Sequence, residues 1–180
     1  MVYIALLRGV NVGGKSMVSM ATLKTCFENL GLDKVKTYIN SGNVIFQCDH
    51  TNAQQLTKQI ETTIEQQLGQ TIQVLLKTHG ELHALVAGIP ATWKNDTATK
   101  CDVMFLWPAV DKPETLSELP INPAIDSVRY EPGAIIWCVD RVNAAKSRMT
   151  RIVGTPLYKQ MTVRNPNTVR KLLALADELA

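Results

Sequence analysis

The sequence predicts an α+β fold built from two ferredoxin-like halves, each with the order β-α-β-β-α-β and an antiparallel sheet. Three observations predict this fold class. Strand-like apolar runs alternate with helix-like segments, and each half contains two strands joined by a short turn, which makes them antiparallel neighbours. The order of elements in residues 1–77 also recurs in residues 78–180, so we expect two domains that arose by duplication.

The first strand and the first helix have clear local signals. The β-branched and aromatic run from Val2 to Leu7 predicts a strand. Ser19 suits a helix N-cap and Gly31 a helix end, and apolar residues recur between them at helical spacing.

A hairpin and a second helix complete the first half. The runs 34–40 and 43–47 flank a short Ser-Gly segment, which predicts a hairpin. An amphipathic stripe follows and ends at Gly69, and residues 71–77 predict a strand. The stripe consists of Leu56, Ile60, Ile64 and Leu68.

The second half repeats this order. Thr78 and Glu81 form a capping box that opens a linking helix. Glu131-Pro-Gly133 has the composition of a turn between two strands. The elements predicted after the linking helix are strand 102–107, short helix 113–119, strands 126–130 and 134–140, helix 146–152, strand 160–164 and terminal helix 166–179.

The composition indicates a globular chain: 46% of the residues are hydrophobic and 19% charged. No apolar run approaches the roughly 20 residues of a membrane helix, and no signal peptide is visible, so we expect a cytoplasmic protein without membrane contact. The four cysteines lie far apart without a Cys-x-x-Cys pair, which favours reduced thiols. They are Cys26, Cys48, Cys101 and Cys138.

Basic residues concentrate near the C terminus. Residues 141–171 contain eight basic residues and no acidic one, whereas the rest of the chain has 11 basic and 16 acidic residues. Such asymmetry is typical of an anion-facing surface and leaves nucleic-acid binding open, although a solvated basic face fits equally well. The scarcity of aromatic residues disfavours base stacking.

The segment Gly9 to Ser16 matches G-x-x-x-x-G-K-[ST], the phosphate loop of nucleotide hydrolases. That loop requires a parallel sheet and a helix that starts within the motif. Here a hairpin follows the first helix, so the hydrolase hypothesis ranks last.

The same loop remains a candidate anion site. Adjacent glycines can direct consecutive backbone N–H groups toward one point, and basic residues flank them. A plain connecting loop is the alternative. The candidate ligand-binding residues are Arg8, Asn11, Gly13, Gly14 and Lys15.

Two further segments carry candidate binding residues. Asn40, Ser41 and Asn43 lie at the predicted hairpin tip, where turn formation alone also explains them. Arg164, Asn167 and Thr168 lie at the start of the terminal helix, whose amino end favours anions. Either Asn165 or Asn167 is expected to cap that helix.

Metal and catalytic motifs are weak. His79 and His83 are one helical turn apart, but no third ligand lies nearby in the sequence, so no metal and no cofactor are expected. Neither a nucleophile elbow nor a Ser-His-acid set is present, and enzymatic activity stays open.

The segments "ALLRGVNVGGKSMVSMATLK", "VKTYINSGNVIF" and "TVRNPNTVRKLLALA" resemble an uncharacterised bacterial family, domain of unknown function 1697. The resemblance implies two similar ferredoxin-like α+β subdomains and a shared surface at 8–15, 40–43 and 164–168. It implies no activity. Pro166 stands where the family usually has Trp.

The three motifs are therefore predicted to converge on one cleft between the domains, which binds a small phosphorylated or carboxylated ligand. A nucleic-acid-binding protein and a protein-interaction module without a ligand are the alternatives. The sequence does not indicate an oligomeric state.

Overall fold

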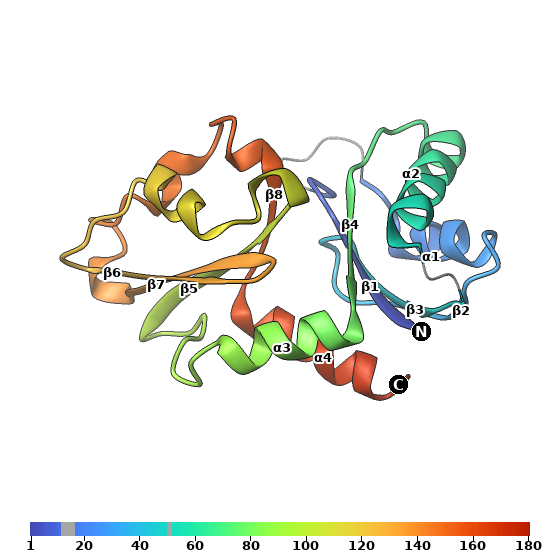
Figure 1. Cartoon of the computed structure of the whole chain (residues 1–180). Coiled ribbons are helices and arrows are strands. Elements are labelled where there is room, and N and C mark those ends of the chain that lie inside the picture. The colour runs from blue at the N-terminus through green and yellow to red at the C-terminus, as the bar shows by residue number, and fades with distance from the viewer. Residues whose placement is uncertain (12–16, 50–51) are drawn as a thin grey trace. The chain divides into compact units, whose positions relative to one another are not determined.

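Two four-stranded antiparallel sheets form the framework of the structure (Figure 1). The computed structural model describes residues 1–11, 17–49 and 52–180. The first sheet has the order β2-β3-β1-β4 and the second β6-β7-β5-β8. The strands are β1 (Val2–Leu7), β2 (Asp33–Thr37), β3 (Asn43–Gln47), β4 (Val74–Thr78), β5 (Thr99–Leu106), β6 (Asp126–Glu131), β7 (Ala134–Asp140) and β8 (Met161–Arg164).

The two strand orders are equivalent, because corresponding strands of each half occupy the same places in their sheets. The predicted α+β class and duplication are therefore confirmed. The chain divides into two units, Met1–Leu82 with Leu172–Ala180, and His83–Lys171. The domain boundary predicted between residues 77 and 78 stays a prediction.

In the first unit, α1 (Met20–Glu28) and α2 (Ala53–Leu68) cover one face of the sheet (Figure 1). Apolar side chains from both helices pack against alternate residues of the strands. The Phe46 ring, at the centre, lies 5.8 Å from the Tyr3 ring and 5.4 Å from the Phe27 ring. This apolar contact holds the helices on the sheet.

The helix ends follow the sequence signals in part. Asn52 caps α2 through a hydrogen bond from Gln55 N to its Oδ1, and Gly69 ends the helix in the left-handed conformation. Ser19 occupies the N-cap position of α1, but its side chain makes no capping bond there. The predicted strand 34–40 ends at Thr37, because Ile39 has a positive φ of 48° that extended backbone does not allow.

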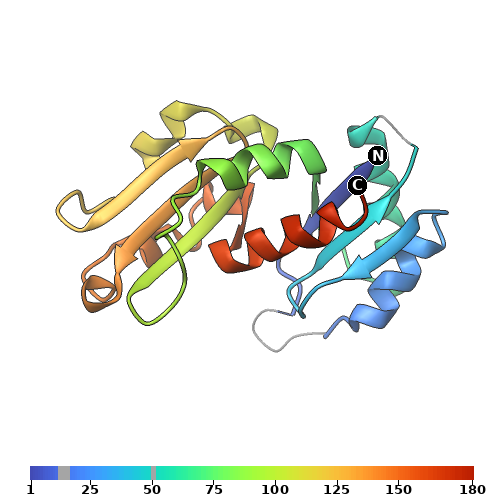
Figure 2. The same ribbon diagram turned by 90° about the horizontal axis from the view of Figure 1, so that it is seen from below.

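The helices α3 (His79–Gly88) and α4 (Pro166–Asp177) each include residues of both units. In the first unit the start of α3 and the end of α4 lie side by side (Figure 2), and His79 Nε2 is 2.6 Å from Asp177 Oδ1. The predicted capping box opens α3, since Glu81 Oε2 accepts hydrogen bonds from both Thr78 N and Thr78 Oγ1.

The two short helices expected in the second unit are 3-10 segments. The short helix expected at 113–119 is a 3-10 helix at 113–118, and the helix expected at 146–152 is a 3-10 helix that begins only at 149. Runs of three to six residues, two of them opened by proline, are too short for α-helical nucleation. The segments are η1 (Pro108–Val110), η2 (Pro113–Glu118), η3 (Arg141–Asn143), η4 (Met149–Ile152) and η5 (Tyr158–Gln160).

The 3-10 segments nevertheless perform the role of helices. Met149, Ile152 and Leu157 pack on the face of the second sheet that carries Met104 and Trp137. Figure 1 shows this layer over β5, β6 and β7. Apolar contact, which is not directional, holds an irregular cover in place.

The expectation of four reduced cysteines is wrong. Cys101 and Cys138 lie opposite each other in the register of β5 and β7, and a disulfide joins them. Cys26 and Cys48 are buried and take no part in a disulfide. The pairing depends on strand register, which spacing in the sequence does not reveal. Among the described residues, no helix combines the length and apolar character that a membrane crossing requires.

Candidate functional site

The first two predicted motifs meet in the first unit. Asn11 Nδ2 donates to the carbonyl oxygen of Asn40 at 2.8 Å and to that of Val18 at 3.0 Å. Its Oδ1 accepts from Val18 N at 2.7 Å. Asn11 therefore ties Val18, which precedes α1, to the hairpin tip at Asn40. We call the surface formed by residues 8–11 and 38–43 the loop–hairpin junction.

Several residues at this junction have backbone conformations with a positive φ, which most side chains disfavour. Asn11 and Ile39 have positive φ values of 57° and 48°, and Ile39 is exposed. A β-branched residue rarely adopts this conformation, because its side chain crowds the backbone. Gly42 also has a positive φ, of 71°, and a side chain there would clash, because its Cβ would lie 2.8 Å from Leu7 Cβ. The hairpin tip therefore packs closely against the end of β1.

The polar residues at the tip differ in their roles. Asn43 is fully buried and donates to Tyr38 O at 3.0 Å and to Ser41 Oγ at 2.9 Å. It stabilises the turn from within. Asn40 is exposed and Ser41 is half-buried, so these two lie closer to solvent.

Part of the first motif is not described. Gly13, Gly14 and Lys15 lie outside the described residues, so their predicted ligand contacts stay predictions. Arg8 is half-buried, and its backbone N donates to Gln73 O at 2.9 Å.

The third motif forms a buried polar cluster in the second unit, which we call the β8–α4 junction. Thr162, Arg164 and Thr168 are only 3%, 7% and 7% exposed. Buried polar side chains are rare among the described residues, and three of the five lie within these seven positions. Arg164 Nη1 donates to Thr162 Oγ1 at 3.0 Å and to Val163 O at 2.8 Å.

The structure decides which asparagine caps α4. Asn165 Oδ1 accepts from Thr168 N at 2.8 Å, which is the N-cap geometry. Burial lowers the pKa of Arg164 to about 10, so its guanidinium remains protonated at neutral pH. A buried positive charge therefore immediately precedes a helix amino end.

Asn167 was predicted to bind a ligand, and in the structure its side chain bonds to the backbone of Asn95. Its Nδ2 donates to Asn95 O at 3.0 Å, and its Oδ1 accepts from Asn95 N at 3.4 Å. These bonds fix the segment that connects α3 to β5. Asn95 is a structural residue that the sequence analysis did not identify, because nothing in the sequence relates positions 95 and 167.

Two arginines of the basic stretch hold the same connecting segment. Arg170 donates to Pro90 O and Trp93 O, each at 2.9 Å. Arg141 Nη2 donates to Asp96 O at 2.7 Å and to Asn95 Oδ1 at 2.8 Å. Part of the positive charge therefore stabilises backbone carbonyl groups. Lys146, Arg148, Arg151, Lys159 and Lys171 are exposed.

The histidine pair lies on α3. His79 contacts Asp177 as described above, and among the described residues no group of three or more metal-ligating side chains occurs.

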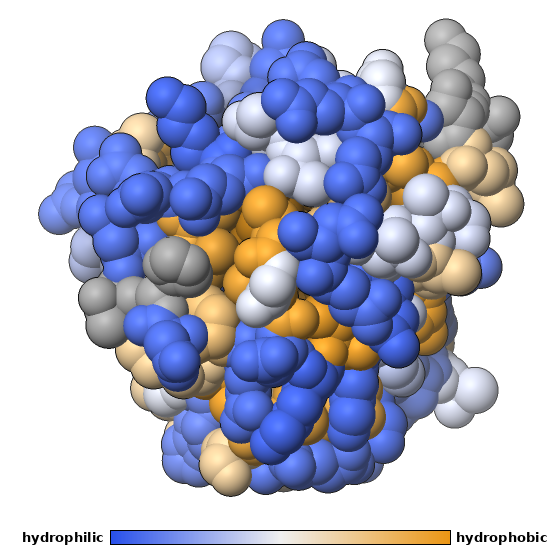
Figure 3. Space-filling view, turned by 90° about the vertical axis from the view of Figure 1, so that its right-hand side faces the viewer, coloured by the Kyte–Doolittle hydropathy of each residue, from blue (hydrophilic) through white to orange (hydrophobic). Residues whose placement is uncertain are grey.

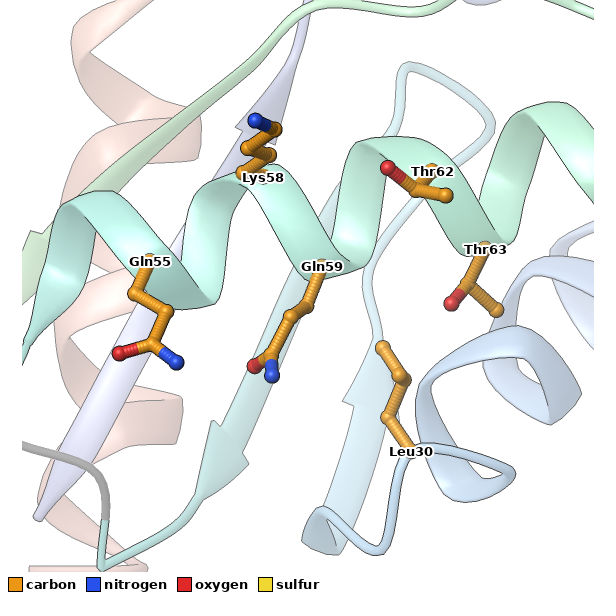
Figure 4. A pocket seen from close by; sticks show the side chains of 6 residues that line it. All are labelled: Leu30, Gln55, Lys58, Gln59, Thr62 and Thr63. Atoms are coloured by element: carbon orange, nitrogen blue, oxygen red, sulfur yellow. The ribbon is translucent and has the colours of Figure 1, made fainter.

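Two surface depressions lie away from the predicted residues. One, of about 330 Å³, is lined by Leu30 and by residues of α2, namely Gln55, Lys58, Gln59, Thr62 and Thr63 (Figure 4). Figure 3 shows this side of the molecule, where hydrophobic side chains are visible between hydrophilic ones. The other, of about 250 Å³, lies beside Trp93 in the second unit.

The fold and these junctions define a class: a duplicated α+β protein in which both halves have the ferredoxin-like split β-α-β topology. The chain belongs to the family described as "Protein of unknown function (DUF1697)", whose model matches residues 1–137. The resemblance expected from the sequence motifs is thereby confirmed. The third motif lies beyond the matched residues.

Among solved structures, the chain is similar to the conserved bacterial protein SP0830 from Streptococcus pneumoniae. The TM-score is 0.83 at 29% sequence identity, and the match covers 97% of this chain and 98% of that chain. No curated protein matches the sequence. Neither description names an activity.

Proposed function

We propose that the protein binds a small phosphorylated or carboxylated ligand, and that Arg164 is the principal cation of the site. One observation carries this proposal: Thr162, Arg164 and Thr168 bury three polar side chains at the amino end of α4. Burying polar groups costs free energy, so a protein core rarely gathers them without a structural or functional reason.

Electrostatics favours an anion at this place. The Arg164 guanidinium is positive, and the amino end of the 12-residue helix α4 carries a partial positive charge of the same sign. Two neighbouring positive features repel each other, and an anion between them relieves that repulsion. A charge-assisted hydrogen bond to such an anion contributes about 1.5–3 kcal/mol.

The first unit offers supporting residues. In the loop–hairpin junction Asn40 is exposed and Arg8 and Ser41 are half-buried, whereas Asn11 and Asn43 position the backbone through their amides. The convergence of all three motifs on one inter-domain cleft stays a prediction, and so does the role of Lys15.

Thermal unfolding in the presence of inorganic phosphate, sugar phosphates, dicarboxylates and nucleotides tests the proposal. At least one of these anions is expected to raise the Tm of the wild type. Arg164→Ala is expected to weaken its binding by about ten- to a hundredfold. Lys171→Ala removes an equal charge from an exposed position of the same helix and serves as the control.

Two results would contradict the proposal. The first is that none of these anions stabilises the wild type. The second is that Arg164→Ala and Lys171→Ala weaken binding equally, since net charge alone would then explain the effect.

Nucleic-acid binding is the second candidate function. Lys146, Arg148 and Arg151 are exposed within six positions of the second unit, a density of charge that suits a phosphate backbone. Fluorescence anisotropy with labelled RNA and DNA at about 50 and 200 mM salt tests this candidate, because phosphate contacts make affinity fall steeply with salt. Absence of binding at the lower salt concentration would exclude it.

A further inference from the structure

A small cavity lies on the face of the second sheet that the 3-10 segments cover. Its volume is about 90 Å³. β5 and β8 form its floor, and η4, Val153 and η5 form its rim. All of these elements belong to the second unit. The side chains that matter for its chemistry are Lys100, Asp102, Met104, Ile152, Val153, Tyr158 and Val163.

Asp102 supplies the only carboxylate among the described residues that line this cavity. Its side chain is half-buried and makes no hydrogen bond or ion pair with another described residue. Burial raises the pKa of this carboxyl, and the positive charge of Lys100, two positions away on the same face of β5, partly opposes that effect. Partial burial removes water from this carboxylate, and no described residue donates a hydrogen bond in its place, so a ligand that supplies a donor is favoured there.

The residue opposite Asp102 shows a related feature. Trp137 pairs with Asp102 in the register of β5 and β7, so both side chains belong to the same face of the sheet. The Trp137 indole Nε1 is buried and has no hydrogen-bond partner among the described residues. An acceptor and a donor without partners therefore occupy neighbouring positions on adjacent strands.

We propose that this cavity binds a small primary ammonium compound, with its nitrogen held by the Asp102 carboxylate and its short aliphatic chain against Met104, Ile152 and Val163. Opposite charge selects the ammonium group, and the apolar walls select the chain. A water molecule takes about 30 Å³ in the liquid, so a cavity of about 90 Å³ holds on the order of three waters, which limits the ligand to a short alkylamine.

This proposal does not depend on the anion-binding function, because it concerns a different face of the unit and a ligand of opposite charge. It also differs from a metal site, since one carboxylate provides too few ligands and no group of three ligating residues occurs among the described residues.

Calorimetric titration with n-butylammonium chloride tests the proposal, with sodium butyrate and n-butanol as probes of matched length. Only the ammonium ion is expected to bind. Asp102→Asn keeps the shape of the side chain but removes its charge, and we expect it to weaken binding by about ten- to a hundredfold. Asp140→Asn is the control, because it removes an exposed carboxylate from β7 of the same sheet.

A second variant tests the cavity itself. Val153 is 61% exposed and lies at the rim, so Val153→Phe narrows the entrance without disturbing the core. It is expected to weaken butylammonium binding while leaving the Tm unchanged. In NMR spectra of the wild type, butylammonium is expected to shift the indole N–H signal of Trp137, assigned with Trp137→Phe.

The proposal is wrong if wild-type protein does not bind butylammonium, or if butyrate or butanol binds with equal affinity. It is also wrong if Asp102→Asn binds the ammonium ion as tightly as Asp140→Asn does. Nonspecific attraction to surface carboxylates predicts that last outcome.

Discussion

Asn11 Nδ2 donates to the carbonyl oxygen of Asn40 at 2.8 Å, and this bond joins two polar motifs that lie 29 residues apart in the sequence. The same amide also binds both backbone groups of Val18. One side chain therefore holds both the backbone of Val18 and the tip of the β2–β3 hairpin. An amide in this position acts through geometry, by holding neighbouring residues in place.

Replacing Asn11 should destabilise the first unit. Asn11→Ala removes three hydrogen bonds and places alanine at a positive φ, so we expect the free energy of unfolding to fall by about 2–4 kcal/mol. Asn11→Gly should cost about 1 kcal/mol less, because glycine accepts that backbone conformation. Urea denaturation measures both values. If the free energies of unfolding of both variants lie within about 0.5 kcal/mol of the wild-type value, these bonds contribute little to stability.

Relief of backbone strain at Ile39 should stabilise the protein. Ile39 is 48% exposed and has a φ of 48°, a conformation that asparagine tolerates far better. We expect Ile39→Asn to raise the free energy of unfolding by about 1 kcal/mol. Ile39→Val retains the branched side chain and should give no increase. A loss of stability in Ile39→Asn would instead indicate that the apolar side chain makes a necessary contact.

The segment between α3 and β5 should loosen when its tethers are removed. Arg170→Ala loses both hydrogen bonds to the carbonyl groups of Pro90 and Trp93. We expect faster amide hydrogen exchange in residues 90–98, because opening this segment then breaks fewer bonds. Lys171→Ala should leave exchange there unchanged. Equal exchange in both variants would mean that other contacts hold the segment.

Asp102 should make stability depend on pH in a defined direction. Its pKa in the folded protein is raised above the ordinary value of 3.8, chiefly by burial, and Lys100 and Tyr158 are the other titratable groups at the cavity. A raised carboxyl pKa gives a stabilising contribution that is present below pH 3.8 and is lost as the pH rises through the folded value.

Asp102→Asn cannot ionise, so it should be more stable than wild type at neutral pH and should lose this advantage under acidic conditions. Urea denaturation between about pH 3 and 7 measures the difference, with Asp140→Asn for comparison. A difference that does not change with pH would contradict the assignment.

The disulfide determines how many cysteine thiols can react with a thiol reagent. Unfolded, unreduced protein should react with a thiol reagent at two cysteines, Cys26 and Cys48, and at four after reduction. Reduction should lower the free energy of unfolding by about 3–4 kcal/mol, because the bridge closes a loop of 37 residues. Four reactive thiols before reduction would show that Cys101 and Cys138 are not joined.

Local sequence signals predicted the first half well. The strand run from Val2 to Leu7, the turn at Gly42 and the helix end at Gly69 each depend on neighbouring residues only, and the structure has all three. In the second half the same reasoning predicted short helices at 113–119 and 146–152, and the structure has 3-10 segments at 113–118 and 149–152, whose apolar residues pack on the sheet.

Functional residues were predicted less completely than the fold. Composition and capping rules drew attention to Arg164 and Asn165, but nothing local distinguished Asp102 from an ordinary strand-end carboxylate. The alternation of polar Lys100 and Asp102 with apolar Cys101 and Val103 is a signal that could have placed Asp102 on one face of β5. Even so, that pattern does not reveal a cavity.

The sequence by itself determined the order of elements, the two hairpins, the duplication and the family, because these follow from local backbone preferences and from short motifs. Only the tertiary structure decided that Cys101 faces Cys138, that Asn11 holds Asn40, and that Asp102 shares a face with Trp137. Each of these pairs joins positions 29 or more residues apart in the sequence. Their proximity depends on strand register and on burial, which arise only when the whole sheet forms and water is excluded from it.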